Sequence, residues 1–267
     1  MQALSKNVCT KKSFVSITIS FSNWLLIAVI LSLSSSCRTK LVPSTIQEQY
    51  YTIDYNIIAD TMILNYYKPY KEKLDAEMNR VIGFSNQHLS KPAIPETLVG
   101  NFFVDALLWK GKKLDSETQL SFATKGGIRS DLRQGKVTVG NIFEVMPFEN
   151  KISILTLRGE DVIRLGDFLV KTNGQPIAGA KLIVENGEIK TFTINGKPID
   201  PALTYKLVTY DYLANGGDYI DFFDRLIERK DYEQPVRDAL IEYVQSITNI
   251  GENIDVKLDG RIQITNE

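Results

Sequence analysis

The sequence is poor in the residue types that build most zinc sites and disulfide frameworks. Its 267 residues include 2 cysteines and 1 histidine. These counts exclude a zinc site of the usual Cys/His kind and a disulfide-stapled fold. The chain also lacks a basic excess, because 31 Lys and Arg face 32 Asp and Glu. Unselective nucleic-acid binding needs such an excess, so we expect no nucleic-acid partner.

The remaining composition is that of a folded globular protein of one or two domains. Hydrophobic residues make up 43% and charged residues 24% of the chain, with 17 Gly and 9 Pro. Disordered and collagen-like chains have a different balance, and both classes are excluded.

The N-terminus has the pattern of an export signal. Lys11 and Lys12 precede a polar stretch and then an apolar run from Trp24 to Leu31, which is too short to span a bilayer and typical of a signal peptide. Small residues then lead to Cys37 in a segment that resembles the lipobox of bacterial lipoproteins. The resemblance implies cleavage after residue 36 and lipidation of Cys37.

We therefore expect a signal peptide over 1–36 and a lipidated tether over 37–60. Acyl chains on Cys37 would hold the protein at a membrane. Arg38, Thr39 and Lys40 contain no acidic sorting signal, which favours an outer-membrane lipoprotein that faces the periplasm. Two alternatives stay open: an ordinary cleaved signal that leaves Cys37 as a free thiol, and an uncut signal anchor.

Residues 61–267 are expected to form one α+β domain with mixed sheets and packed helices. Apolar spacing near 3.6 residues predicts helices over 62–78, 96–110, 160–171 and 235–247. Short apolar or alternating runs predict strands over 81–84, 120–123, 151–157, 181–184, 190–194 and 205–210. Asn186-Gly187 and Asn195-Gly196 are typical of hairpin turns.

Two of three chemically informative segments are a glycine pair and an aromatic turn. Gly126 and Gly127 follow a predicted strand and let the backbone approach a ligand, while Arg129 can bind a carboxylate or phosphate. Phe148 comes directly after Pro147, which fixes the chain ahead of the ring, and Asn150 follows two residues later. Each segment alone also fits an ordinary role, as a turn with a solvated arginine or as a core phenylalanine.

The third segment places Tyr212 six residues before Asp218, with two glycines between them. Such a loop can bring a ring and a carboxylate to one ligand. Together and in this order, the segments resemble the C-terminal domain of the 5′-nucleotidase / UDP-sugar hydrolase family, from about Asp60 to Ile264. The resemblance also runs through Glu96, Thr97, Gly100, Asn101, Phe102, Asp105, Ala106, Leu157, Gly159, Val162, Asn195, Gly196, Lys197, Pro198, Asp200, Pro201, Tyr210, Leu213 and Ala214.

The resemblance implies a role for each of these residues. A nucleoside base would stack between Phe148 and Tyr212, and Asp218 would accept hydrogen bonds from ribose hydroxyls. Arg129 would approach ribose or phosphate, and Asn150 the base edge or a neighbouring loop. The predicted substrate-binding set is therefore Gly126, Gly127, Arg129, Phe148, Asn150, Tyr212 and Asp218.

The sequence departs from the family pattern at several positions. Thr124 and Lys125 stand where the family usually has Asn and Gly, and Thr124 cannot offer the paired donor and acceptor of an amide. Ala93 stands where the family has a further arginine, with Lys91 the nearest cation. Tyr219 replaces the glycine that usually follows the aspartate.

The resemblance also bears on catalysis. In this family a separate N-terminal metallophosphatase domain hydrolyses the substrate, with two metals held by Asp, His and Asn. This chain has one histidine, His88, which we expect in a surface loop. We therefore expect no catalytic residue, metal site or cofactor in this chain, and divalent metals only in a partner metallophosphatase.

Two functions of different class remain. In the first, the chain is the nucleoside- or nucleotide-recognition half of a split 5′-nucleotidase and acts with a separate metallophosphatase chain. In the second, it is a stand-alone periplasmic lipoprotein that binds and scavenges nucleosides or nucleotides. A vestigial structural domain, or hydrolysis at an unrecognised site, completes the alternatives.

Overall fold

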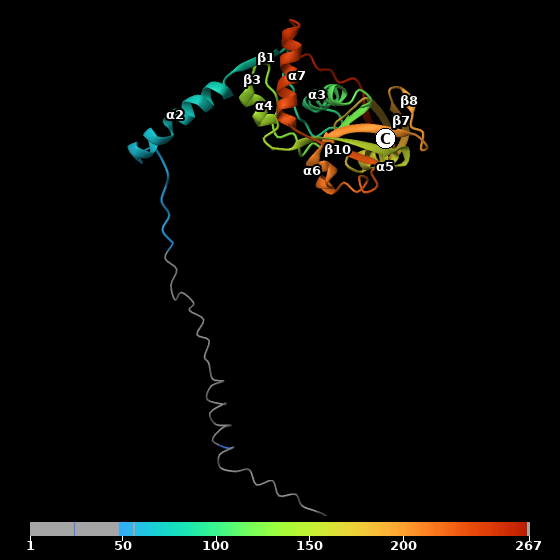
Figure 1. Ribbon diagram of the computed structural model, residues 1–267, viewed down its shortest axis with the longest axis horizontal. Coiled ribbons are helices and arrows are strands. Elements are labelled where there is room, and N and C mark those ends of the chain that lie inside the picture. Colours follow the sequence, from blue (N-terminus) through green and yellow to red (C-terminus); the bar gives the residue numbers. More distant parts are fainter. Residues whose placement is uncertain (1–23, 25–47, 56, 266–267) are drawn as a thin grey trace, which may run out of the picture. The chain divides into compact units, whose positions relative to one another are not determined.

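The computed structural model describes residues 24, 48–55 and 57–265 (Figure 1). The chain divides into two units, Met1–Ile58 and Ala59–Glu267. In the first unit, residues 48–55 form no helix or strand. Most of the expected signal peptide, the expected lipidation site Cys37 and the start of the tether lie outside the described residues. Within the described residues, no helix is long and apolar enough to cross a membrane.

A five-stranded sheet organises the second unit. Its strand order is β10-β4-β9-β2-β5. Strands β2 and β9 are parallel, and the other neighbours are antiparallel. The strands are β10 (Glu228–Pro235), β4 (Lys151–Arg158), β9 (Thr204–Tyr210), β2 (Leu120–Phe122) and β5 (Ile177–Ala178).

Helices cover both faces of this sheet. The hydroxyl of Ser121 donates a hydrogen bond of 2.7 Å to the carbonyl of Val104 in α3 (Leu98–Leu114). The next residue, Phe122, points to the other face, where its ring centroid lies 6.1 Å from that of Phe168 in α5 (Gly159–Lys171). Successive strand residues alternate between faces, so β2 is buried on both sides. All three of its residues are buried.

A second sheet of four strands has the order β11-β6-β7-β8. It contains β11 (Ile262–Thr265), β6 (Ala180–Glu185), β7 (Glu188–Ile194) and β8 (Lys197–Pro198). The two expected hairpin turns connect β6 to β7 and β7 to β8. Asn186 and Gly187 both have positive φ, +52° and +77°, as a type I′ turn requires. The prediction of both turns is confirmed.

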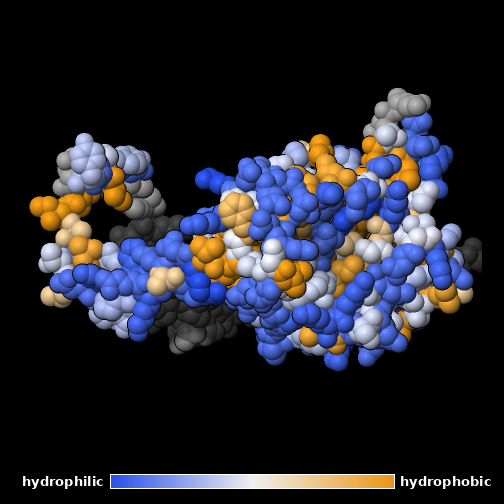
Figure 2. Space-filling model, turned by 90° about the horizontal axis from the view of Figure 1, so that it is seen from above, coloured by the Kyte–Doolittle hydropathy of each residue, from blue (hydrophilic) through white to orange (hydrophobic). Residues whose placement is uncertain are grey.

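A third, two-stranded sheet consists of β1 (Val81–Ser85) and β3 (Gly135–Thr138). Helix α4 (Val139–Val145) follows β3, and α7 (Val236–Asn249) contacts β1, where Thr248 donates to the carbonyl of Ile82. Helix α2 (Thr61–Met78) begins at the cap Asp60 and has no buried residue. On the face visible in Figure 2, hydrophobic residues form small groups among hydrophilic ones.

The predicted α+β class with mixed sheets is confirmed, and the differences lie at boundaries and in short or polar elements, such as α4 and β5, that the sequence patterns do not predict. The helix expected from residue 96 begins at Leu98 after the cap Thr97. Pro235 ends β10 and precedes α7 instead of opening it. Apolar alternation does not predict β10, because charged residues occupy most of that strand.

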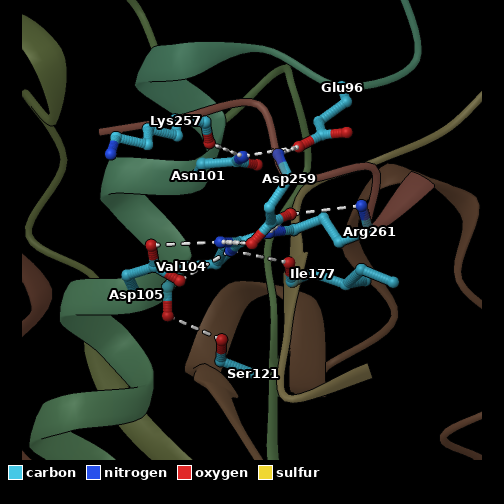
Figure 3. Close-up of polar contacts among 9 residues, drawn as sticks. All are labelled: Glu96, Asn101, Val104, Asp105, Ser121, Ile177, Lys257, Asp259 and Arg261. Carbon is cyan, nitrogen blue, oxygen red and sulfur yellow. Dashed lines mark hydrogen bonds and ion pairs between the residues drawn. The ribbon is translucent and has the colours of Figure 1, made fainter. Parts of the chain in front are cut away.

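The C-terminal segment is tied to α3 by a polar network (Figure 3). The guanidinium of Arg261 donates to Asp105 in α3 at 2.6 Å and to Asp259 at 2.8 Å. Glu96 accepts from the side chain of Asn101 at 2.7 Å and from the backbone of Asp259 at 3.0 Å. Three residues of the family-like segment, Glu96, Asn101 and Asp105, therefore join distant parts of the chain.

Candidate functional site

A pocket lies at one end of the five-stranded sheet, where the strand directions bring three segments together. Parallel neighbours β2 and β9 end on the same side. Antiparallel β4 starts beside the end of β9, because Ile152 pairs with Tyr210. The segment after β2, the segment before β4 and the segment after β9 therefore meet at one end of the sheet.

The pocket has a volume of about 320 Å³. Its lining contains all seven residues of the predicted substrate-binding set together with Tyr210. They are Gly126, Gly127, Arg129, Phe148, Asn150, Tyr210, Tyr212 and Asp218. The family-like segments thus converge on one concave surface, although they are up to 92 residues apart in sequence, from Gly126 to Asp218.

Close packing requires a glycine at position 127 and leaves little space at Gly126. A Cβ atom on Gly127 would lie 2.3 Å from the hydroxyl oxygen of Tyr210. A Cβ on Gly126 would lie 3.3 Å from Oδ2 of Asp218. Larger residues at Gly127 would displace Tyr210 and the polar groups around it.

Side chains of the domain hold both oxygens of the Asp218 carboxylate. The hydroxyl of Tyr212 donates to Oδ1 at 3.1 Å. The hydroxyl of Thr124, a residue that is 3% exposed, donates to Oδ2. Asp218 itself has a left-handed backbone with φ +54°, which is uncommon for a residue other than glycine and frequent at binding sites. A carboxylate oxygen has two lone pairs, so each can accept a second hydrogen bond from a ligand.

Thr124 therefore has a defined place in the site, although it departs from the family pattern. Its hydroxyl lies 3.4 Å from that of Tyr210. Burial raises the pKa of Tyr210 to about 12, so this tyrosine stays neutral and can donate a proton in a hydrogen bond. Thr124 and Tyr210 are outside the predicted substrate-binding set. The contact of Thr124 with a carboxylate 94 positions away has no local signal in the sequence.

The two rings expected to form a slot both lie on the pocket. Phe148 is 39% exposed and Tyr212 is 48% exposed. Among the ring contacts of the described residues, none joins Phe148 to Tyr212. Rings in direct contact would leave no space for a ligand, whereas separated rings on one pocket can receive a flat group between them. The Tyr212 ring also packs tightly on Gly217, where a Cβ would lie 2.5 Å from it.

Arg129 contributes a positive charge beside Phe148. Its guanidinium carbon lies 5.9 Å from the centre of the Phe148 ring, and its Nη1 donates to the carbonyl of Gly126 at 3.3 Å. The backbone of Arg129 is fixed by a hydrogen bond of 2.8 Å to the carbonyl of Val145. Arg129 is exposed and lines the pocket, and a guanidinium there is able to bind an anionic or hydroxyl-bearing ligand.

Aromatic packing fixes the chain that follows Asp218. The ring of Phe222 lies 5.4 Å from Phe168 in α5, 6.0 Å from Phe122 in β2 and 4.6 Å from Phe223. These four rings form edge-on or tilted contacts, which stabilise buried clusters. The loop that carries Asp218 is thereby attached to the core immediately after the site.

The other departures, at Ala93, Lys125 and Tyr219, lie outside the pocket lining. Lys125 donates through Nζ to the carbonyl of Asn173 at 2.9 Å, and partial burial lowers its pKa. Lys91, the cation nearest to Ala93 in sequence, donates its backbone N–H to Oδ1 of Asp131 at 2.8 Å. Tyr219 is 97% exposed with φ +62°. None of these side chains belongs to the set that lines the pocket.

His88 lies in a surface loop, as expected. Its Nε2 is 3.1 Å from Oδ2 of Asp131, and half of its side chain is exposed. Across residues 24, 48–55 and 57–265, no group of three or more His, Cys, Asp or Glu side chains is arranged to hold a metal ion.

Several known proteins are similar to this chain. Apyrase of Tabanus yao is 26% identical over 254 residues, which cover 79% of this chain and 43% of the apyrase. Protein UshA of Escherichia coli strain K12 is 27% identical over 176 residues, or 61% of this chain and 30% of UshA. The chain thus spans less than half the length of these relatives.

Solved structures show the same fold. A 5′-nucleotidase precursor from Thermus thermophilus superposes with a TM-score of 0.65 at 24% identity, over 77% of this chain and 42% of that one. The NAD nucleotidase of Haemophilus influenzae gives a TM-score of 0.61 at 16% identity, over 78% and 42%. A family model described as 5′-nucleotidase, C-terminal domain matches residues 77–225. Because this match covers more than half of the sequence, the chain belongs to the 5′-nucleotidase C-terminal domain family.

Proposed function

We propose that this chain is the nucleoside- or nucleotide-recognition half of a 5′-nucleotidase-type phosphohydrolase and acts with a separate metallophosphatase chain. The observation that carries the proposal is the pocket in which two separated rings, a glycine turn, an arginine and an anchored carboxylate converge. Similarity to an apyrase and to solved nucleotidases favours a nucleotide ligand.

Each part of the pocket suits one part of a nucleoside. A base would stack between Phe148 and Tyr212, a contact that contributes roughly 1–3 kcal/mol per base and tolerates different bases. Asp218 accepts but does not donate hydrogen bonds when ionised, which suits the hydroxyls of a ribose. Arg129 would then contact ribose or phosphate. Recognition in this scheme needs no proton transfer by the chain itself.

Hydrolysis would take place on the partner. The divalent metals of a metallophosphatase supply an activated hydroxide and stabilise charge on the phosphoryl group. The chain described here would present the nucleotide so that its phosphate reaches those metals. Holding two reacting groups in place can lower a barrier by several kcal/mol, so a recognition half can raise the rate without taking part in the chemistry.

The test combines the full-length chain with an exported metallophosphatase encoded in the same genome, a divalent metal and AMP. Phosphate release is expected when both proteins are present and to fall when the recognition chain carries Asp218→Ala. Full activity of the metallophosphatase alone would reject the split enzyme. Nucleoside binding without any stimulation would instead support the stand-alone scavenging lipoprotein.

We further propose that Cys37 is lipidated and holds the protein at the outer membrane, facing the periplasm. The sequence up to this cysteine supports the proposal. Expression of the full chain in a bacterial host with labelled palmitate should give a labelled protein in the membrane fraction. The Cys37→Ser variant should be unlabelled, and equal labelling of both would rule out this anchor.

A further inference from the structure

One carboxylate joins the two segments that carry the pocket rings. Asp211 is the first residue of α6 (Asp211–Ala214) and follows β9 directly. Its Oδ1 accepts the backbone N–H of Lys151 at 3.1 Å and that of Tyr212 at 2.8 Å. Lys151 starts β4 three residues after Phe148. A single oxygen atom therefore holds the backbone of the Phe148 segment against that of Tyr212.

The opposite side of the Phe148 segment is fixed to α7. The guanidinium of Arg237 donates to Glu149 at 2.5 Å and reaches the carbonyl of Phe148 at 3.5 Å. The backbone N–H of Val236 donates to the carbonyl of Asn150 at 2.9 Å. Arg237 also stacks on Phe143, with its guanidinium carbon 3.8 Å from the ring centre. Contacts on this side hold the segment to the helix, whereas Asp211 links it to Tyr212.

Spacing decides how well two rings bind a flat ligand. Carbon atoms attract best at about 3.5–4.0 Å, and an extra gap of about 0.5–1 Å loses a quarter to a half of that attraction. A slot for one planar group therefore needs its two walls held at a fixed distance. The Asp218 carboxylate binds the hydroxyls of Tyr212 and Thr124, so it anchors one wall. The pairing of β4 with β9 ends at Ile152 and Tyr210, and Asp211 adds the next link between the two segments, closer to the rings.

We propose that Asp211 is a positioning residue that fixes the distance between Phe148 and Tyr212 and thereby sets the affinity for a flat heterocycle. The proposal rests on the proposed function, because it assumes that this slot receives a base. Asp211 does not line the pocket, so its effect is exerted through the two backbones that it holds.

The test compares three variants of the full chain. Asp211→Ala removes the acceptor. Asp211→Asn keeps an amide oxygen that can accept both N–H groups. Asp115→Ala is the matched control, because Asp115 also accepts a backbone N–H, from Glu117 at 3.0 Å, and pairs with Lys206, but lies outside the pocket. Adenosine affinity is measured by titration calorimetry at a temperature where circular dichroism shows every variant folded.

Adenosine should bind at least fivefold more weakly to Asp211→Ala and within about twofold of the unmodified protein to Asp211→Asn and Asp115→Ala. Hydrogen exchange without ligand should speed up at Lys151 and Tyr212 in Asp211→Ala and remain slow in Asp211→Asn. A merely stabilising role would leave the affinity of the folded variants unchanged, and unchanged affinity would overturn the proposal.

The two proposals can fail separately. If the unmodified protein binds no nucleoside or nucleotide, the proposed function is rejected. Hydrogen exchange then still tests the link between the two segments: faster exchange in Asp211→Ala supports it, and unchanged exchange at Lys151 and Tyr212 overturns it.

Discussion

The hydroxyl of Tyr212 donates a hydrogen bond to Asp218, with 3.1 Å between the two oxygen atoms. The stacking ring and the carboxylate of the pocket are thus connected to each other before any ligand arrives. Thr124 holds the second carboxylate oxygen from the other side. The Tyr212 hydroxyl therefore holds Asp218, while the Tyr212 ring offers a stacking surface to the pocket.

Substitution of Tyr212 should reveal this separation. Tyr212→Phe keeps the ring and its contact with Gly217, so adenosine affinity should change by less than about 1 kcal/mol. Tyr212→Ala removes the stacking surface and should cost about 1–3 kcal/mol. Calorimetric titration of both variants gives the comparison. Equal losses in the two variants would mean that the hydroxyl, and not the ring, holds the ligand.

Asp218 should act through ribose hydroxyls. We expect Asp218→Ala to weaken adenosine binding by about 1–3 kcal/mol, because hydroxyl donors of the ligand lose their acceptor. The same substitution should have little effect on 2′,3′-dideoxyadenosine, which lacks those hydroxyls. Titration of both ligands with both proteins forms a double-mutant cycle. An equal loss for the two ligands would contradict a ribose contact.

Tyr210 should make stability depend on alkaline pH. Burial raises its pKa to about 12 in the folded protein, while an unfolded tyrosine ionises at about 10. The contribution of the protonated Tyr210 hydroxyl to the free energy of unfolding is therefore fully present below a pH of about 10. It is lost as the pH rises through the pKa of the folded protein, by up to about 2–3 kcal/mol.

Tyr210→Phe cannot ionise and removes this contribution. Guanidinium unfolding between pH 8 and 11.5 should show a stability advantage of the unmodified protein that shrinks with pH relative to Tyr210→Phe. Other tyrosines titrate equally in both proteins, so the difference isolates Tyr210. Parallel curves for the two proteins would show that the hydroxyl of Tyr210 ionises as freely as in the unfolded chain.

The network at Arg261 should support the fold and not the pocket. Arg261→Ala leaves Asp105 and Asp259 without their shared guanidinium, and the expected loss is about 1.5–3 kcal/mol of unfolding free energy. Arg80→Ala is the control, because Arg80 pairs with Glu77 on the surface and such pairs contribute below about 1 kcal/mol. Urea unfolding measures both. Nucleoside affinity should be equal in the two variants, and a selective loss in Arg261→Ala would connect the network to the site.

Local sequence signals predicted much of the fold, whereas the set of residues around the pocket followed from the resemblance to the 5′-nucleotidase C-terminal domain family. The apolar runs of β4 and β9 and the Asn-Gly turns are visible within a few residues. Phe148 and Asp218 each lie in a short segment with a chemical rationale, but only the resemblance joins these segments into one site. Their roles as ligand contacts stay predictions, since placement around one pocket does not test binding.

Contacts between distant residues could not be predicted in this way. Arg261 binds Asp105 across 156 positions, and no local pattern distinguishes Arg261 from a solvated arginine. Asp211 shows the same limit. Its proposed role depends on the backbone N–H of Lys151, which the pairing of β4 with β9 brings beside it. Strand β10 was missed since its charges replace the alternation that marks a half-buried strand.

Both edge strands of the five-stranded sheet are poorly suited to pairing with another chain, each for a different reason. One edge is β5, which has two residues. The other is β10, where Glu228, Arg229, Lys230 and Asp231 precede Glu233 and the terminal Pro235. Very short, charged or proline-ended strands are poor templates for pairing with another chain. Copies of the protein at high local concentration would therefore have little tendency to aggregate through these two edge strands.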